Sequence, residues 1–94
     1  MEYLKVDWRH SFAEEPVALW YELDDQRRTK RVIELFPDGQ YGYASETQSS
    51  HGTMLSEEPI PSPSEIDAQS EFASGTISSA EFEQIWVQAV NTIY

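Results

Sequence analysis

The chain has 94 residues and a mass of 10.8 kDa, which is enough for one hydrophobic core and predicts a single domain over residues 1–94. Hydrophobic residues make up 39% and aromatic residues 13% of the sequence, a composition of folded rather than disordered chains. Seventeen acidic and six basic residues give a net charge of −11, a field that repels phosphate backbones and argues against direct nucleic-acid binding.

Four β-strands are predicted in the first half of the chain. Apolar side chains alternate over residues 3–10, which is the period of a half-buried strand. The β-branched and aromatic run at 17–23 predicts a central strand, and a third strand is expected at 29–36. Phe36–Gly39 carries Pro, Asp and Gly in the order of a tight turn, from which a fourth strand at 40–45 returns.

The second half of the chain begins with an irregular segment and ends with a helix. Ser, Thr, Gly, Pro and acidic residues dominate to about residue 80, and the alternating prolines at 59–63 predict an extended passage. Residues 64–69 favour one or two helical turns. Ser78 and Glu81 form a capping box that begins the C-terminal helix. The apolar face of this helix comprises Phe82, Ile85, Trp86, Ala89, Val90 and Ile93.

This order of elements predicts an α+β fold, with a four-stranded antiparallel sheet and an amphipathic C-terminal helix packed on one face. The N-terminus carries charges where a signal peptide needs an unbroken apolar stretch. The longest apolar run, residues 17–21, is far shorter than the roughly 20 residues that span a bilayer. The chain also contains no cysteine. We therefore expect a soluble, cytoplasmic protein that makes no membrane contact.

Motifs of catalysis and of cofactor binding are missing from the sequence. The two histidines, His10 and His51, have forty residues between them and lie outside any H-x-x-H or H-E-x-x-H pattern. We expect His10 at a strand end and His51 in a loop. No G-x-S-x-G nucleophile elbow and no glycine-rich phosphate loop occurs. The sequence therefore predicts neither an enzyme nor a metal or cofactor site.

Charge is distributed unevenly along the chain. All six basic residues lie in the first 31 positions, whereas residues 32–94 hold ten acids and no base. The basic run Arg27–Arg31 could bind phosphate, but across a hairpin it can pair with Glu22, Asp24 and Asp25, and ion pairing is the favoured interpretation. The acids from Glu34 onward have no such neutralising neighbours in the sequence.

Two groups of residues are candidates for partner binding. Five acids along the irregular segment either form a solvated surface that keeps the protein soluble, or form a carboxylate surface for Lys and Arg of a partner. Trp8 and Trp86 fall on predicted core faces, while alternation leaves the side of three further aromatics open. The candidate partner-binding residues are Glu57, Glu58, Glu65, Asp67, Glu71, Trp20, Tyr41 and Tyr43.

The sequence also resembles a known family over nearly its whole length. The resemblance rests on stretches such as Val6–His10, Val32–Phe36, Gly42–Ala44, Pro59–Pro61 and Glu81–Glu83, and the family comprises small acidic bacterial domains of unknown function. It implies no catalytic residues. Small acidic bacterial domains of this kind are similar to immunity proteins, which neutralise secreted antibacterial toxins, many of them basic nucleases.

These observations lead to one hypothesis and two alternatives. The leading hypothesis is an immunity or inhibitor protein that binds a basic toxin domain through electrostatic steering and aromatic anchors. One alternative is a small cytoplasmic adaptor, without catalytic activity, whose acidity serves only solubility. The other is a nucleic-acid mimic that presents carboxylates in place of phosphates.

Overall fold

The computed structural model describes residues 1–50 and 52–91, which form five strands and two helices. The predicted elements are confirmed, with ends that differ by a few residues from the expected ones. Two expected features, the loop position of His51 and the place of Ile93 on the helix face, lie outside the described residues. The elements are β1 (Glu2–Trp8), β2 (Ala18–Leu23), β3 (Thr29–Leu35), β4 (Tyr41–Ser45), α1 (Pro63–Asp67), β5 (Phe72–Thr76) and α2 (Ser79–Asn91).

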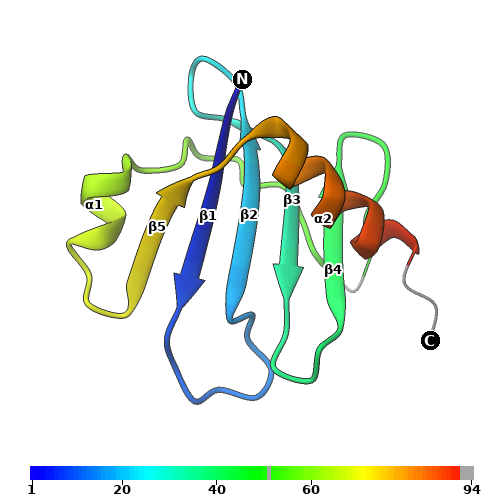
Figure 1. The fold of residues 1–94 in the computed structure, drawn as a ribbon, viewed down its shortest axis with the longest axis horizontal. Coiled ribbons are helices and arrows are strands. Elements are labelled where there is room, and N and C mark those ends of the chain that lie inside the picture. The colour runs from blue at the N-terminus through cyan, green and yellow to red at the C-terminus, as the bar shows by residue number, and fades with distance from the viewer. Residues whose placement is uncertain (51, 92–94) are drawn as a thin grey trace.

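The sheet is antiparallel throughout, with five strands in the order β4-β3-β2-β1-β5 (Figure 1). The expectation of four strands was therefore wrong by one. β5 has the sequence FASGT, which lacks the apolar alternation of a strand. It becomes a strand because it pairs with β1, with Trp8 opposite Phe72 and Leu4 opposite Thr76. Such pairing depends on residues more than sixty positions away and leaves no local signature.

The two faces of the sheet are covered by different elements. Helix α2 lies in front of the sheet in Figure 1 and contacts β2, β3 and β4. The core beneath it contains Ala18, Trp20, Ile33, Phe82 and Ala89. The crossing segment, defined here as residues 46–50 and 52–62, passes behind the sheet and leads to α1. A second core cluster of Leu4, Val6 and Ile66 lies on this side.

Local hydrogen bonds begin α2 and close the β3–β4 turn as predicted. Ser78 Oγ accepts the Glu81 backbone N–H at 3.1 Å, and its hydroxyl donates to Glu81 Oε1 at 3.4 Å. This is the expected capping box. Gly39 has a φ of +87° and donates its N–H to the Phe36 carbonyl at 2.9 Å. Both features depend on residues three positions apart, so the sequence predicts them well.

None of the described helices has the length and apolarity needed to cross a membrane.

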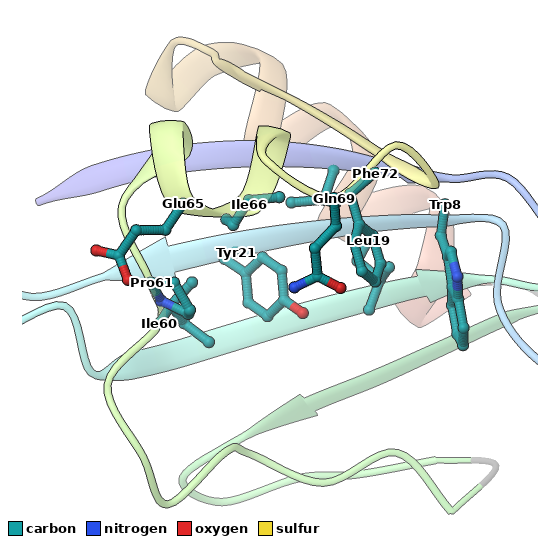
Figure 2. A pocket seen from close by; sticks show the side chains of 10 residues that line it. Trp8, Leu19, Tyr21, Ile60, Pro61, Glu65, Ile66, Gln69 and Phe72 are labelled. Atoms are coloured by element: carbon teal, nitrogen blue, oxygen red, sulfur yellow. The ribbon is translucent and has the colours of Figure 1, made fainter.

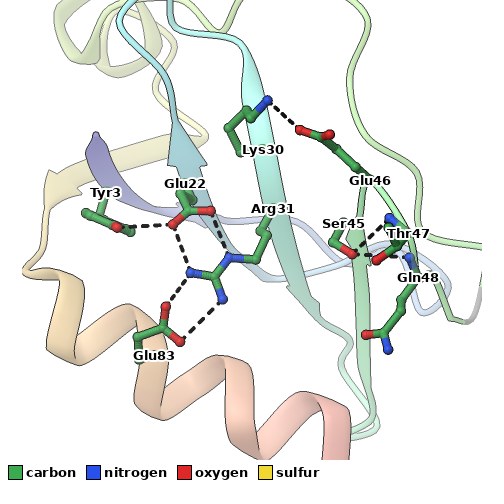
Figure 3. A network of polar contacts seen from close by, with 9 residues as sticks. All are labelled: Tyr3, Glu22, Lys30, Arg31, Ser45, Glu46, Thr47, Gln48 and Glu83. Atoms are coloured by element: carbon green, nitrogen blue, oxygen red, sulfur yellow. Dashed lines mark hydrogen bonds and ion pairs between the residues drawn. The ribbon is translucent and has the colours of Figure 1, made fainter.

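A network around Arg31 joins α2 to the sheet (Figure 3). Arg31 on β3 lies directly opposite Glu22 on β2, and its Nε and Nη2 each donate to that carboxylate at 2.8 Å. The same guanidinium pairs with Glu83 of α2 and lies over the rings of two residues of that helix. These rings belong to Phe82 and Trp86, whose centroids are 4.9 and 5.0 Å from the guanidinium carbon. The favoured ion-pairing interpretation of the basic run is confirmed for Arg31.

The network perturbs the ionisation of its members. Hydrogen bonds from Arg31 hold the pKa of the Glu22 carboxyl below its usual value, and the pKa of Arg31 is raised by the same bonds. Tyr3 donates its hydroxyl to Glu22 Oε2 at 3.1 Å. Burial and this contact raise the pKa of Tyr3. The expectation that acids from Glu34 onward lack neutralising partners was wrong, because Glu83 pairs with Arg31 and Glu46 pairs with Lys30.

On the opposite face, the crossing segment packs closely against β4. Thr53 is only 3% exposed, and its hydroxyl donates to Glu34 Oε1 on β3 at 2.7 Å. A Cβ atom at Gly42 on β4 would overlap Thr53 Oγ1, so glycine is what permits this close approach. The crossing segment is thus fixed at its β4 end by side-chain contacts rather than by regular secondary structure.

Candidate functional site

A groove lies on the face of the sheet opposite α2, between α1 and the Ile60–Pro61 part of the crossing segment (Figure 2). Its volume is about 420 Å³, within the size range of sites that bind small molecules or long side chains. The side chains from the strands are Val6, Trp8, Leu19, Tyr21 and Phe72. The remaining lining comes from Ile60, Pro61, Glu65, Ile66 and Gln69.

Strand register places the apolar and aromatic side chains of the groove together. Val6 on β1 lies opposite Leu19 on β2, and Trp8 on β1 lies opposite Phe72 on β5. Because side chains alternate between the faces of a strand, these residues share the side away from α2. Trp8 was expected in the core. The structure places it half-buried at one end of the groove, where its ring is accessible.

Arg27 holds the far wall of the groove in place. Its Nε donates to the Ile60 carbonyl at 2.8 Å and its Nη2 to the Pro61 carbonyl at 2.7 Å. The Ile60 N–H returns a hydrogen bond to the Arg27 carbonyl at 2.9 Å. Arg27 also forms an ion pair with Glu2 rather than with the expected acids of the β2–β3 hairpin. It adopts a positive φ of 61°, which is uncommon for a residue other than glycine.

Three polar side chains reach into or border this apolar groove. Burial, together with the charge of Glu34, raises the pKa of Tyr21 to about 12, so its hydroxyl is neutral at physiological pH. Neither the Tyr21 hydroxyl nor the Gln69 side-chain amide forms a hydrogen bond with any of the described residues. Glu65 accepts one hydrogen bond from the Ser62 hydroxyl at 3.0 Å and lies at the end of the groove away from Trp8. A few polar groups in an apolar cavity are typical of a binding site.

Beyond Trp8 the groove continues into a row of rings, called here the aromatic row: Phe72, Trp8, His10 and Phe12. The ring centroids are 5.7 Å apart for Phe72 and Trp8, 4.4 Å for Trp8 and His10, and 5.5 Å for His10 and Phe12. At the outer end, Phe12 is 63% exposed. Exposed rings packed in this way are typical of anchors in protein interfaces.

His10 shapes the loop that carries Phe12. Its Nδ1 accepts the Phe12 backbone N–H at 2.9 Å, so the ring proton resides on Nε2, which donates to the Pro16 carbonyl at 2.7 Å. We expected His10 at a strand end. Because β1 ends at Trp8, His10 instead lies in the loop that follows the strand. Both ring nitrogens are engaged within the loop. No group of three or more potential metal ligands occurs in residues 1–50 and 52–91.

Acidic side chains border the aromatic row. Glu14 and Glu15 line a shallow hollow together with Trp8 and Phe12. Glu71 accepts a weak hydrogen bond from the Trp8 indole N–H at 3.4 Å. Arg9 is the basic residue of this region, and its backbone N–H donates to the Glu71 carbonyl at 2.8 Å. The surface around the aromatic row therefore combines accessible aromatic area with an excess of carboxylates.

The five acids proposed from sequence have separate positions. Glu65 borders the groove and Glu71 contacts Trp8, so these two belong to the site. Glu57 and Glu58 are exposed on the crossing segment and line neither the groove nor the hollow. Asp67 has a structural contact, because its Oδ1 accepts the Ser74 backbone N–H at 2.7 Å and so covers an outward-facing group of edge strand β5.

The three aromatics proposed as anchors lie on the α2 face. Trp20 is 7% exposed and belongs to the core, opposite Ile33 in the sheet register, so its ring is not presented to a partner and its assignment is corrected. Tyr41 packs near Trp20 with centroids 6.4 Å apart, and Tyr43 packs edge-on against Trp86 at 5.4 Å. Both tyrosines are half-buried.

Sequence reasoning named Glu65 but missed most of the aromatic row and the other two polar groups of the groove, Tyr21 and Gln69. A signal existed in the spacing of Trp8, His10 and Phe12, which continue the alternation of β1 past its end. No comparable signal marks Tyr21 or Gln69, because the first lies within an unbroken apolar run and the second in a polar segment. Their convergence is a property of the folded chain.

Comparisons with known proteins bear on the family of this chain. A search of curated proteins and a search of solved structures gave no match. A family model described as "Domain of unknown function (DUF6881)" matches residues 2–91, a range that includes every strand, both helices and all residues of the groove. The chain therefore belongs to this family of domains of unknown function.

Proposed function

We propose that this protein is an inhibitor that binds a basic protein through the aromatic row and the adjoining groove. In its most specific form, the proposal is a cytoplasmic immunity protein of a bacterial cell that neutralises a toxin domain, of which a nuclease is the leading candidate. The observation that carries the proposal is the exposed Phe12 ring, stacked on His10 beside Glu14 and Glu15, in an aromatic row whose Trp8 contacts Glu71.

The aromatic row supplies the short-range part of binding. Aromatic side chains contribute large contact areas at low conformational cost, and a ring that is already packed loses less freedom when a partner covers it. The two hydrogen bonds of His10 hold the Phe12 loop in one shape before binding. This pre-organisation favours a tight complex centred on Phe12.

The carboxylates and the net charge supply the long-range part. A charge of −11 steers a basic protein toward the surface and raises its association rate, more strongly at low salt. A nuclease surface that binds phosphates is basic, so a carboxylate-rich protein is complementary to the same surface. Binding there would cover the substrate groove of the toxin and prevent catalysis.

The first experiment captures the partner. The tagged protein is incubated with lysate of its host at low salt, washed with increasing salt and analysed by mass spectrometry. A stoichiometric basic protein that is released by salt and is toxic without this chain supports the proposal. A neutral partner whose binding is insensitive to salt would instead indicate the adaptor function, and displacement of the partner by DNA would indicate a nucleic-acid mimic.

A second experiment locates the surface with the captured partner. The triple variant Glu14→Lys, Glu15→Lys and Glu71→Lys reverses charges beside the aromatic row, whereas Glu57→Lys, Glu58→Lys and Asp38→Lys reverse as many exposed acids outside the site. The two variants have the same net charge. We expect the association rate of the first variant to be lower than that of the control variant by about tenfold or more. Equal effects would show that only the overall field matters and would remove the assigned surface.

A further inference from the structure

We propose that the groove between α1, the crossing segment and the sheet is a binding site for an arginine side chain of the partner. This inference rests on the proposed function for the source of the arginine, since a protein partner must supply it. The chemistry of the groove can nevertheless be tested without any partner.

The apolar part of the groove matches the body of an arginine. Trp8, Tyr21 and Phe72 bring aromatic rings to one cavity, and Ile60 with Ile66 adds aliphatic walls. The methylene stem of arginine packs on aliphatic surface, and its planar guanidinium stacks on aromatic faces. Aliphatic and aromatic walls in the same cavity therefore accommodate both parts of the side chain.

Charge decides the sign of the ligand. Glu65 is the only charged side chain among the described residues that line the groove, and the groove lies in a protein with a net charge of −11. The Ser62 hydroxyl donates a hydrogen bond to Glu65 Oε1, which leaves Oε2 available to accept one from a ligand. A cationic head at the Glu65 end is therefore favoured, whereas a phosphate or carboxylate ligand would be repelled.

Hydrogen-bond acceptors favour arginine over lysine. The Gln69 amide oxygen and the Tyr21 hydroxyl oxygen form no hydrogen bond with the described residues, so both can accept from a ligand. Arginine offers five N–H donors in one plane, which can serve separate acceptors while the plane stacks on a ring. Lysine has a compact head with three donors and no planar face to stack on a ring, so it fits these acceptors and rings less closely.

The groove is also formed before any ligand enters. Arg27 fixes the carbonyls of Ile60 and Pro61 at one wall, and Ser62 caps α1 at the other by accepting the Glu65 N–H at 3.3 Å. A preformed cavity avoids the cost of ordering its walls on binding. Single side-chain analogues should for that reason bind weakly but at a defined place.

The test is an NMR titration of the full chain with N-acetylarginine amide, N-acetyllysine amide and the uncharged analogue N-acetylcitrulline amide. We expect arginine to shift the Trp8 indole N–H and the amides of Ile66 and Gln69, while the Trp20 indole on the opposite face stays unchanged. Citrulline, which has nearly the same shape without the charge, should bind roughly fivefold or more weakly. Lysine should also bind more weakly than arginine.

Two variants test the named contacts. Glu65→Gln should weaken arginine binding about threefold without changing citrulline binding, and Tyr21→Phe should weaken arginine binding while keeping the ring. Glu58→Gln, outside the groove, is the matched control. Equal affinities for arginine and citrulline, shifts spread over Glu57 and Glu58, or no shifts in the groove would each overturn the inference. If a basic partner is captured but the titration fails, the proposed function stands and the arginine site is refuted. If the titration succeeds but no basic partner is captured, the arginine site stands and the proposed function is refuted.

Discussion

The two faces of the sheet are closed in different ways, and one arginine takes part in each closure. On the α2 face, Arg31 pairs with the carboxylates of Glu22 and Glu83 and lies against aromatic rings, so charges and apolar surface are both satisfied within the molecule. On the groove face, Arg27 binds the carbonyls of Ile60 and Pro61, and in the groove beside them the Tyr21 hydroxyl and the Gln69 amide form no hydrogen bond with the described residues. The first face thus has its charges paired within the molecule, whereas the second keeps two polar groups without such partners among the described residues.

The largest expected effect comes from breaking the α2 face at Arg31. Arg31→Met keeps much of the stem but leaves Glu22, whose side chain is 11% exposed, without its charge partner. We expect the free energy of unfolding to fall by about 3–5 kcal/mol in urea denaturation, as when one partner of a buried ion pair is removed. Lys30→Met, which breaks an exposed pair with Glu46, should cost about 1 kcal/mol or less. Similar losses of unfolding free energy in Arg31→Met and Lys30→Met would contradict the special role of Arg31 on the α2 face.

Alkaline pH should weaken the groove face through Tyr21. Its pKa is raised to about 12 in the folded protein, against an ordinary value of 10.0. The stabilisation is therefore fully present below pH 10 and is lost as the pH rises toward 12, by roughly 2–3 kcal/mol in all. Thermal unfolding measured across this range should show the loss in the wild type and a smaller loss in Tyr21→Phe. Identical pH dependence of the two proteins would show that the loss of stability does not come from ionisation of Tyr21.

Attachment of the crossing segment can be tested at Gly42. Gly42→Ala would push a methyl group into Thr53 Oγ1 and disturb its hydrogen bond to Glu34, at an expected cost of about 1–3 kcal/mol. Gly75→Ala on β5 is the matched control, since no atom lies near its added methyl group. Chemical denaturation of both variants measures the difference. A Gly42 variant as stable as the Gly75 variant would show that the crossing segment adapts freely.

Acid pH should act on the α2 face. The pKa of Glu22 is lowered in the folded protein, first by hydrogen bonds from Arg31. Its contribution is therefore present above the pKa of the unfolded chain and disappears as the pH falls through the lower, folded pKa. Stability should decline with acidification in the wild type, and Glu22→Gln should flatten that part of the curve. A Glu22→Gln protein that retains the full decline would assign the acid sensitivity to other carboxylates.

The smallest effect on stability is expected at the aromatic row. Phe12 is 63% exposed, so Phe12→Ala should change the free energy of unfolding by only about 0.5 kcal/mol or less. The same substitution should lower affinity for the captured partner by about tenfold or more. Calorimetric unfolding and a binding titration of one protein sample separate the two quantities. A large loss of stability with unchanged affinity would make Phe12 a structural residue.

Trp8 and Trp20 show how much of the site could be predicted from the sequence. Trp8 and Trp20 both lie in strands that contain other apolar residues, and both could belong to a core on sequence pattern alone. Trp20 is covered because α2 packs on its side of β2, and Trp8 borders a groove because α1 and the crossing segment cover its side incompletely. The sequence pattern therefore predicts that a face exists, and packing of distant elements decides how far that face is covered.

Local features were determined by the sequence itself. The residue patterns of β1 to β4, the turn at Phe36–Gly39 and the capping box of α2 each depend on residues within a few positions, where backbone geometry and short hydrogen bonds act directly. The α+β class follows from these elements.

Only the tertiary structure decided the fifth strand and the binding surface. β5 is a strand because β1 offers it hydrogen bonds, and the groove unites segments from Val6 to Phe72 around a wall held by Arg27. Such contacts form between parts of the chain whose separation is set by the whole fold, so composition and local periodicity carry little information about them. The acids of the sequence indicated a charged surface; the fold places Glu65 at the groove and Glu71 against Trp8, and it places the others elsewhere.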